Sequence, residues 1–388
     1  MKPITAAIVA LFLVCSVGPT VHAVQSELPV ALQATIPPPN LKVSSWALMD
    51  ASTGVMIAAA KPDRRVEPAS LSKLMTAYLV FRGIDSGEFR LDEEVLVSEN
   101  AWRSIGSRMF IEPGDRVSIE NLIKGLVIQS GNDAAVALAE YVAGSEAAFV
   151  GMMNQAAAGL NLNGTHYVNS TGLPHPDHFS TARDISRLAG AITQQFPEHY
   201  RYYSMKEFGW KGIHQKNRNK LLWRDETVDG VKTGHTRSAG YCLVGSAERD
   251  GMRLIASVLG AQSKTKRADA VYALLRYGFA SYDSKTVYRG GSKIVTAKVY
   301  KSVSPSLAVG VGSDIRLTLP KTPGRQLDAD IRLNEPLVAP IVKGSTVGTL
   351  TLRLNGDEIG AHPLVALGDA VPGSWAVKAY DTLRLWVR

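Results

Sequence analysis

The chain has 388 residues, 45% of them hydrophobic, and a formal net charge of +8 at pH 7. This composition excludes an intrinsically disordered chain and is sufficient for two or three domains, each with its own core. The positive charge favours anionic surroundings such as a membrane surface or a cell wall. No run of Lys and Arg is interleaved with aromatic residues, so we do not expect nucleic acid as a partner.

The N-terminus has the features of a secretory signal peptide over residues 1–23. Lys2 provides the positive start, residues 4–17 are almost entirely apolar, and Ala23 ends an acceptable small-residue cleavage site. Residues 24–43 are polar and rich in proline, which is typical of a linker. We therefore expect an exported protein whose first folded domain begins near residue 44.

Alternation and helical periodicity predict a mixed α/β domain over residues 44–283. Two antiparallel strand pairs are expected within residues 45–60 and 241–259. Residues 210–223 are unusually polar for a strand, and we expect them to line a cleft. Helices are expected at residues 71–81, 117–129, 134–142, 149–160, 181–192 and 268–279.

The pattern changes after residue 284 to short alternating segments. Residues 350–354 alternate strictly and run into Asn355-Gly356, a tight hairpin signal, so a small β-sandwich domain is expected over residues 284–372. In the final segment, 373–388, one helical face carries Trp375, Ala379, Leu383 and Trp386. This amphipathic helix fits either a membrane interface or packing on the β-domain.

A serine and a lysine stand one helical turn apart at the start of the first predicted helix. Ser70 and Lys73 would lie on one face, where a neutral amine can act as base toward the hydroxyl. The motif is weak alone, because serine is a common helix cap and Ser263 and Lys266 have the same spacing. Its interpretation depends on two further motifs.

Those motifs follow in the order S-x-N and K-T-G. Ser130 and Asn132 lie between two predicted helices, where a short turn can project them into a cleft, or where they merely cap the second helix. Lys232-Thr233-Gly234 lies in a predicted strand. Together with Ser70 and Lys73, these residue types are typical of an acyl-transfer site.

The chemistry of each group suggests a role in that site. Lys73 would deprotonate Ser70, while the charge of Lys232 would keep Lys73 partly neutral. Ser130 could pass a proton to the leaving amine, and Asn132 could hold a substrate amide. Thr233, with a nearby guanidinium, could hold a substrate carboxylate. The backbone N–H groups of Ser70 and His235 would form the oxyanion hole.

A zinc site is the competing interpretation for one loop. His175 and His178 fit an H-x-x-H spacing, but Pro174 and Pro176 argue against a helix that presents both rings together. No third ligand has suitable spacing. We therefore expect two surface-loop histidines, and neither a metal nor a cofactor.

The three motifs in this order resemble those of the penicillin-recognising serine acyl-transferases. Their flanks, including Gln129-Ser130-Gly131-Asn132-Asp133 and Asn217-Arg218-Asn219, are similar to the low-molecular-mass D-alanyl-D-alanine carboxypeptidases. The resemblance implies a β-lactamase-like serine transpeptidase domain, with an antiparallel sheet flanked by helices, followed by a small β-sandwich.

The resemblance also implies roles and partners. Ser70 would be acylated and Lys73 its base, with Ser130, Asn132 and Lys232 completing the site. Candidates for the substrate-binding set are Asn132, Lys232, Thr233, Gly234, His235, Arg218 and Arg267. The expected substrates are peptidoglycan stem peptides, and β-lactam antibiotics would inhibit by acylating the same serine. Such proteins act at the periplasmic face of the bacterial inner membrane, held there peripherally by the C-terminal helix.

Three alternatives remain at this point. A class A β-lactamase would need a glutamate in the loop over residues 166–180, where the only acid is Asp177. A D,D-endopeptidase shares all three motifs. A non-catalytic wall-binding or penicillin-sensing protein is the alternative outside the enzymes, and the intact motif side chains argue against it.

Overall fold

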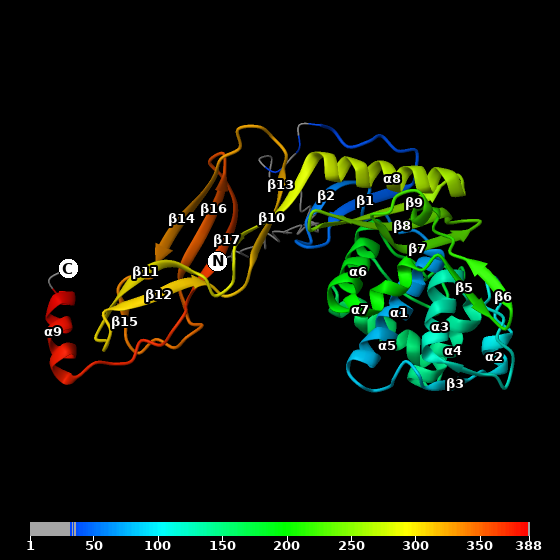
Figure 1. Cartoon of the computed structure of the whole chain (residues 1–388), viewed down its shortest axis with the longest axis horizontal. Coiled ribbons are helices and arrows are strands. Elements are labelled where there is room, and N and C mark those ends of the chain that lie inside the picture. Colours follow the sequence, from blue (N-terminus) through cyan, green and yellow to red (C-terminus); the bar gives the residue numbers. More distant parts are fainter. Residues whose placement is uncertain (1–31, 33, 35, 387–388) are drawn as a thin grey trace, which may run out of the picture.

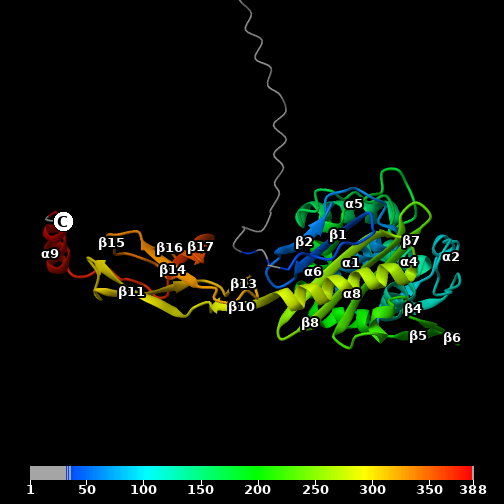
Figure 2. The same cartoon turned by 90° about the horizontal axis from the view of Figure 1, so that it is seen from above.

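The computed structural model describes residues 32, 34 and 36–386. The predicted signal peptide, residues 1–23, and part of the predicted linker lie outside the described residues. Figures 1 and 2 show two folded parts in succession along the chain: a larger α/β part and a smaller β-rich part, followed by the C-terminal helix.

A five-stranded antiparallel sheet forms the centre of the larger part. Across the sheet the strands are β2 (Met56–Ala60), β1 (Ser45–Asp50), β9 (Met252–Ala261), β8 (Gly240–Arg249) and β7 (Val228–Thr236). Both predicted strand pairs are therefore confirmed, as β1 with β2 and as β8 with β9. Strand β7 carries the K-T-G motif and lies at the edge of the sheet, so its outer side is open to a ligand.

Helices bury both faces of this sheet. Along β1, Ala47 and Met49 belong to one cluster of buried side chains and Trp46 and Leu48 to the other, as the two-residue period of a strand requires. Figure 1 shows a long helix on one face and the remaining helices on the other. The helices in direct contact with the two faces are α8 (Lys264–Ser281) and α6 (Ala182–Gln195).

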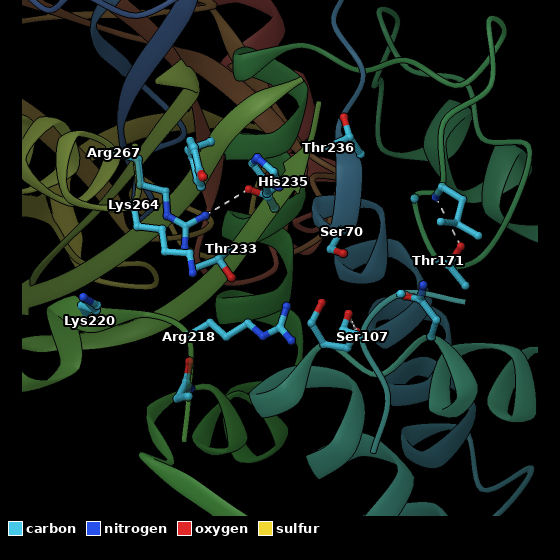
Figure 3. A pocket seen from close by; sticks show the side chains of 18 of the residues that line it. Ser70, Ser107, Thr171, Arg218, Lys220, Thr233, His235, Thr236, Lys264 and Arg267 are labelled. Atoms are coloured by element: carbon cyan, nitrogen blue, oxygen red, sulfur yellow. Dashed lines mark hydrogen bonds between the residues drawn. The ribbon is translucent and has the colours of Figure 1, made fainter. Parts of the chain in front are cut away.

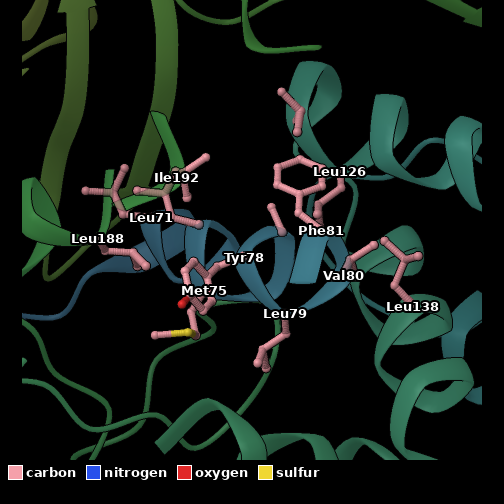
Figure 4. Close-up of a cluster of buried hydrophobic side chains, with 14 of the residues drawn as sticks. Leu71, Met75, Tyr78, Leu79, Val80, Phe81, Leu126, Leu138, Leu188 and Ile192 are labelled. Atoms are coloured by element: carbon pink, nitrogen blue, oxygen red, sulfur yellow. The ribbon is translucent and has the colours of Figure 1, made fainter. Parts of the chain in front are cut away.

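Helix α1 (Lys73–Asp85) runs through the middle of the helical cluster. Every residue from Lys73 to Phe81 is buried, which is why the sequence is apolar all round rather than on one stripe. Figure 4 shows its side chains directed toward Leu188 and Ile192 on one side and toward Leu126 and Leu138 on the other. The short 3₁₀ turn η2 (Ala69–Ser72) precedes α1 and carries Ser70.

Hydroxyl caps determine where several helices begin. Ser118, Ser145 and Thr181 each accept a backbone N–H from the third residue of the helix that follows. Ser263 does the same for Lys266, so this second serine–lysine pair is a cap. The capped helices are α3 (Ile119–Lys124), α5 (Glu146–Gly159), α6 and α8. A π-helical turn, η3 (Gly125–Gln129), extends α3 to the S-x-N motif, and α4 (Asn132–Ala143) follows.

The polar stretch after residue 206 contains a short hairpin that the sequence did not reveal. Its strands are β5 (Glu207–Trp210) and β6 (Ile213–Lys216), and a 3₁₀ turn, η5 (Lys220–Trp223), follows. Most of its residues are exposed, so no apolar alternation marks the strands. Lys211, at the hairpin tip, pairs with Glu112 and Asp115 in the loop before strand β4 (Arg116–Ser118).

The β-rich part contains a six-stranded sheet and a two-stranded sheet, as the sandwich prediction requires. Strand β16 (Thr346–Leu354) and β17 (Asp357–Ala366) form the predicted hairpin, with positive φ at Asn355 (53°) and Gly356 (90°). The other strands of the larger sheet are β14 (Leu327–Leu333), β12 (Ser306–Val311), β11 (Lys293–Tyr300) and β15 (Leu337–Val338). The smaller sheet pairs β10 (Tyr282–Tyr288) with β13 (Ile315–Pro320).

Helix α9 (Trp375–Trp386) ends the described chain and has no buried side chain. Trp375 is 83% exposed and Trp386 86% exposed. Its link to the β-rich part includes the Asp381 carboxylate, which accepts the backbone N–H of Lys301 at 2.5 Å. Over the described residues, no helix alone has the length and hydropathy to span a membrane, although the bent pair α4 and α5 meets both criteria together.

Truncation of one α1 side chain should destabilise the larger part. Phe81 is fully buried and stacks on His199 with a centroid separation of 5.2 Å. Phe81→Ala should lower the free energy of unfolding by about 3–5 kcal/mol, because it leaves a cavity in a packed core. Urea unfolding would measure the change. Phe110 is 44% exposed, so Phe110→Ala should differ from wild type by only about 0.5 kcal/mol. Equal effects of the two variants would contradict this account.

Candidate active site

The predicted site residues gather around one cavity of about 590 Å³ at the edge of the sheet. Figure 3 shows it bounded by β7 and α8 on one side and by the helical cluster on the other. Lys73 and Lys232 lie behind its surface and are only 1% and 3% exposed. The predicted residues that line it are Ser70, Ser130, Asn132, Arg218, Thr233, Gly234, His235 and Arg267.

The Lys73 amine is surrounded by three oxygen atoms. Its Nζ lies 3.2 Å from Ser70 Oγ, 2.6 Å from Asn132 Oδ1 and 2.7 Å from the carbonyl oxygen of Thr171. A neutral amine has two N–H groups and one lone pair. When Asn132 and Thr171 accept the two N–H groups, the lone pair remains for the Ser70 hydroxyl proton. The geometry therefore suits proton transfer from Ser70 to Lys73.

Burial makes a neutral Lys73 accessible near neutral pH. Burial and, to a smaller extent, the charge of Arg218 lower the pKa of Lys73, Asp133 opposes both, and the resulting pKa is about 7. The sequence argument attributed this effect to Lys232, whereas the structure makes burial the largest cause and Arg218 the next. Burial also holds the pKa of Lys232 well below its usual value, and the charges of Lys73 and Arg218 act in the same direction.

The Thr171 carbonyl was missed by the sequence argument, because a backbone acceptor has no side-chain signature. Its position comes from Asn169, whose Oδ1 accepts the Thr171 hydroxyl at 3.0 Å and the Gly172 N–H at 2.7 Å. Such a turn is what Asn followed by small residues favours. Asn169 thereby directs the Thr171 carbonyl toward Lys73.

The Ser130 turn is anchored to residues 105–111. Ser130 is left-handed, with φ 66°, and its carbonyl accepts the Ser107 hydroxyl at 2.6 Å. The Asn132 amide donates to Ile105 O at 2.5 Å, so both of its polar atoms already have protein partners. A Cβ on Gly131 would lie 2.7 Å from Asp133 Oδ1, which explains the glycine in the middle of this S-G-N motif. Among the described residues, the buried Ser130 Oγ has no hydrogen-bond partner and is free for a proton relay.

Strand β7 lies directly against the turn that carries Ser70. A Cβ on Gly234 would lie 3.0 Å from the carbonyl oxygen of Pro68, so the glycine permits this approach. The approach places the strand edge near Ser70, where an oxyanion could be bound between the two backbones. The His235 ring lies beside that of Tyr241, with centroids 4.1 Å apart.

Two asparagines hold Arg218 in the cavity wall. Asn217 donates its side-chain amide to Met205 O at 2.9 Å, and Asn219 donates to Gly230 O at 2.8 Å. Both side chains are buried, while Arg218 extends across the cavity toward Ser107 (Figure 3). The two asparagines therefore hold the backbone of residues 217–219 in place, and the guanidinium of Arg218 extends into the cavity.

Comparison with known proteins identifies the family. A profile described as D-alanyl-D-alanine carboxypeptidase, Peptidase S11, matches residues 32–263, and one for the penicillin-binding protein 5 C-terminal domain matches residues 282–371. The chain belongs to the D-alanyl-D-alanine carboxypeptidase family. The predicted family, fold class and serine-hydrolase class are thereby confirmed.

Individual relatives agree over most of the chain. It is 39% identical to D-alanyl-D-alanine carboxypeptidase DacC of Escherichia coli K12 over 359 residues, covering 90% of each protein. It is 40% identical to DacD of the same strain over 353 residues, covering 89% of this chain and 91% of DacD. The structure of penicillin binding protein 5 from Haemophilus influenzae aligns with a TM-score of 0.82 at 36% identity, covering 87% of this chain and 99% of that one.

In this member of the carboxypeptidase family, Arg267 is partly engaged by the sheet. Its Nη1 donates to Gly234 O at 3.0 Å and to Cys242 O at 3.3 Å, and burial lowers its pKa. Arg267 therefore lines the cavity and also links β7 to β8 through these two hydrogen bonds.

The expectation that residues 210–223 line a cleft is confirmed by Lys216 and Lys220 in the cavity lining, whereas sequence reasoning missed Lys264. Lys216, Lys220 and Lys264 join Arg218 and Arg267 there, and the lining contains no Asp or Glu. A cavity of one charge sign raises the local concentration of oppositely charged ligands. The site therefore favours substrates that carry carboxylates.

The expectation that His175 and His178 are both surface residues was wrong for His178. Its side chain is buried and lies 2.7 Å from Ser72 Oγ, while His175 is exposed. Across the described part of the chain, no group of three or more His, Cys, Asp or Glu side chains could hold a metal ion.

The pKa of Lys73 should set the pH dependence of acylation. Only the neutral amine accepts the Ser70 proton, so the second-order rate constant of acylation, which reports the free enzyme, should rise as the pH increases through about 7. Arg218→Gln removes a cation, raises the pKa of Lys73 and should move the midpoint to higher pH. Stopped-flow acylation by penicillin would measure this. Arg353→Gln in the β-rich part should leave the midpoint in place, and an unmoved midpoint for Arg218→Gln would contradict the electrostatic account.

Proposed function

We propose that the protein is a serine-type D-alanyl-D-alanine carboxypeptidase that removes the terminal D-alanine from peptidoglycan stem peptides. The matched family is described as D-alanyl-D-alanine carboxypeptidase, and the matched C-terminal domain and the Haemophilus influenzae structure are named as those of penicillin-binding proteins. The observation that carries the assignment to this cavity is the Lys73 amine, whose two N–H bonds to Asn132 and Thr171 leave its lone pair 3.2 Å from Ser70 Oγ.

Acylation begins with transfer of the Ser70 hydroxyl proton to Lys73. The Ser70 oxygen then attacks the carbonyl carbon of the penultimate D-alanine, and the backbone N–H groups of Ser70 and His235 stabilise the oxyanion. Collapse of the tetrahedral intermediate breaks the C–N bond. The proton on Lys73 passes through the Ser130 hydroxyl to the leaving amine, and free D-alanine departs.

Hydrolysis of the acyl-enzyme completes the cycle. A water molecule attacks the ester carbonyl, gives one proton to Lys73, and releases the shortened peptide acid as Ser70 regains a proton. The cationic lining supports recognition of the terminal carboxylate. Arg218 and Thr233 are the contacts we assign to that group, with Arg267 also in the lining and Lys232 buried behind it.

We also infer that α9 holds the enzyme at a membrane surface. Four of its large side chains, Trp375, Tyr380, Leu383 and Trp386, are more than half exposed. Exposed Trp at both ends of an amphipathic helix favours an interfacial position, and the net positive charge favours anionic lipid. With the predicted signal peptide, this indicates the periplasmic face of the inner membrane.

The reaction and its nucleophile can be tested together. Wild-type protein should release D-alanine from a peptide ending in D-Ala-D-Ala, and penicillin should add to Ser70 by mass spectrometry. Ser70→Ala should abolish both, because it removes the hydroxyl that lies 3.2 Å from the Lys73 amine. Ser86→Ala, with its hydroxyl at the other end of α1, should retain both activities.

Other outcomes would change the assignment. Release of D-alanine by Ser70→Ala would place the nucleophile elsewhere. A penicillin adduct at Ser70 without D-alanine release would point to an endopeptidase or a penicillin sensor.

The membrane role has its own test. Deletion of residues 375–388 should abolish co-sedimentation with vesicles that contain anionic phospholipid, because it removes the exposed apolar side chains of α9. Trp102→Ala removes an exposed tryptophan from the larger part and should leave sedimentation unchanged. Undiminished pelleting of the deletion variant would make α9 a helix that only packs on the β-rich part.

A further inference from the structure

The turn before the proposed nucleophile has an unusual backbone conformation. Ala69 has a φ of 50°, in the left-handed region, and is only 1% exposed. A side-chain-bearing residue keeps this conformation only where its surroundings impose it. Gly172 packs on one side, since a Cβ there would lie 1.8 Å from the Ala69 carbonyl oxygen. The other constraint is a chain of hydrogen bonds.

That chain runs from His178 through Ser72 to Ala69. Ser72 Oγ donates to the Ala69 carbonyl at 2.9 Å and lies 2.7 Å from His178 Nε2. His178 Nδ1 accepts the backbone N–H of Val168 at 3.2 Å, so it carries no proton. A neutral imidazole has one N–H, which must then be on Nε2 and point at Ser72. The ring of His178 therefore donates to the Ser72 hydroxyl, and the Ser72 hydroxyl donates to the Ala69 carbonyl.

The environment of His178 keeps its ring neutral. Burial, followed by the charges of His166, His175 and Lys73 that face the ring, lowers the pKa of His178 to about 4. The edge-on Tyr167 ring, with centroids 5.7 Å apart, closes the site on another side. At neutral pH the His178 ring is therefore uncharged, and the hydrogen bonds from His178 to Ser72 and from Ser72 to Ala69 keep this direction.

We propose that His178 is a positioning residue for the oxyanion hole and the nucleophile. The Ala69 carbonyl and the Ser70 N–H belong to one planar peptide group, so a bond that fixes the carbonyl also fixes the direction of that N–H. The Ser72 hydroxyl supplies this bond, and His178 orients the hydroxyl. The inference rests on the proposed function, in which Ser70 supplies both the attacking oxygen and an oxyanion donor.

The same loop orients the base. Residues 166–180 contribute the Thr171 carbonyl to Lys73, Gly172 to the packing against Ala69, and His178 to the hydrogen-bond chain. One loop therefore couples the geometry of the base to that of the oxyanion hole. This coupling gives a role to His178, which is buried and is not among the residues that line the cavity.

The test separates positioning from folding by measuring penicillin acylation as a first-order rate constant and a non-covalent Kd. Ser72→Ala should lower the rate constant roughly 10- to 100-fold, with Kd nearly unchanged, because a misdirected oxyanion donor affects the transition state. Ser72→Thr keeps the hydroxyl and should stay near wild type. His178→Leu should match Ser72→Ala, and the double variant should be no slower, since both break one chain.

The controls make each result decisive. His175→Leu, in the same loop but exposed, should acylate like wild type. Wild-type rates in a folded Ser72→Ala or His178→Leu variant would refute the inference alone. Where His178→Leu does not fold, Ser72→Ala, which removes one oxygen atom, decides the question. A wild-type protein that is not acylated at Ser70 would refute the proposed function and this inference with it.

Discussion

The environment of the buried Lys73 amine is the constraint on which the rest of the site depends. An amine taken out of water is costly unless its polar hydrogens have partners, and here Asn132 and Thr171 supply them. Neither acceptor lies on α1. The Ser130 turn and the loop over residues 166–180 must therefore both be in place before the amine can face Ser70. A low pKa and a directed lone pair are two consequences of the same burial.

Close backbone contacts bring these distant segments together. Gly234 lets β7 approach Pro68, Gly172 lets the 166–180 loop approach Ala69, and Gly131 lets the Ser130 turn approach the backbone nitrogen of Met109. At each point a Cβ would lie within 3.2 Å of a backbone atom of the other segment, so a side chain would push one segment away. The glycines in these motifs are thus as much part of the site as the ionisable groups, because they set the distances between them.

The sequence was sufficient to predict the features that side-chain identity and hydrophobic periodicity determine. Ser70, Lys73, Ser130 and Lys232 are visible as motifs, and the buried α1 and the Asn355-Gly356 hairpin follow from apolar runs and turn residues. The sequence was insufficient for features that depend on a backbone atom or on burial in the folded protein. The Thr171 carbonyl has no residue signature, the exposed β5–β6 hairpin has no apolar alternation, and His178 is buried only because Ser72 and the Val168 N–H satisfy its two nitrogens.

Arg218 connects recognition to the chemistry of the base. Its charge lowers the pKa of Lys73, and its guanidinium lines the cavity proposed for the substrate carboxylate. A carboxylate bound there offsets that charge, so the pKa of Lys73 rises in the complex and the amine becomes a stronger base at the moment when Ser70 must lose its proton. The cost is a smaller neutral fraction near pH 7. Because burial remains the larger cause of the low pKa, substrate binding adjusts this balance without abolishing the neutral form.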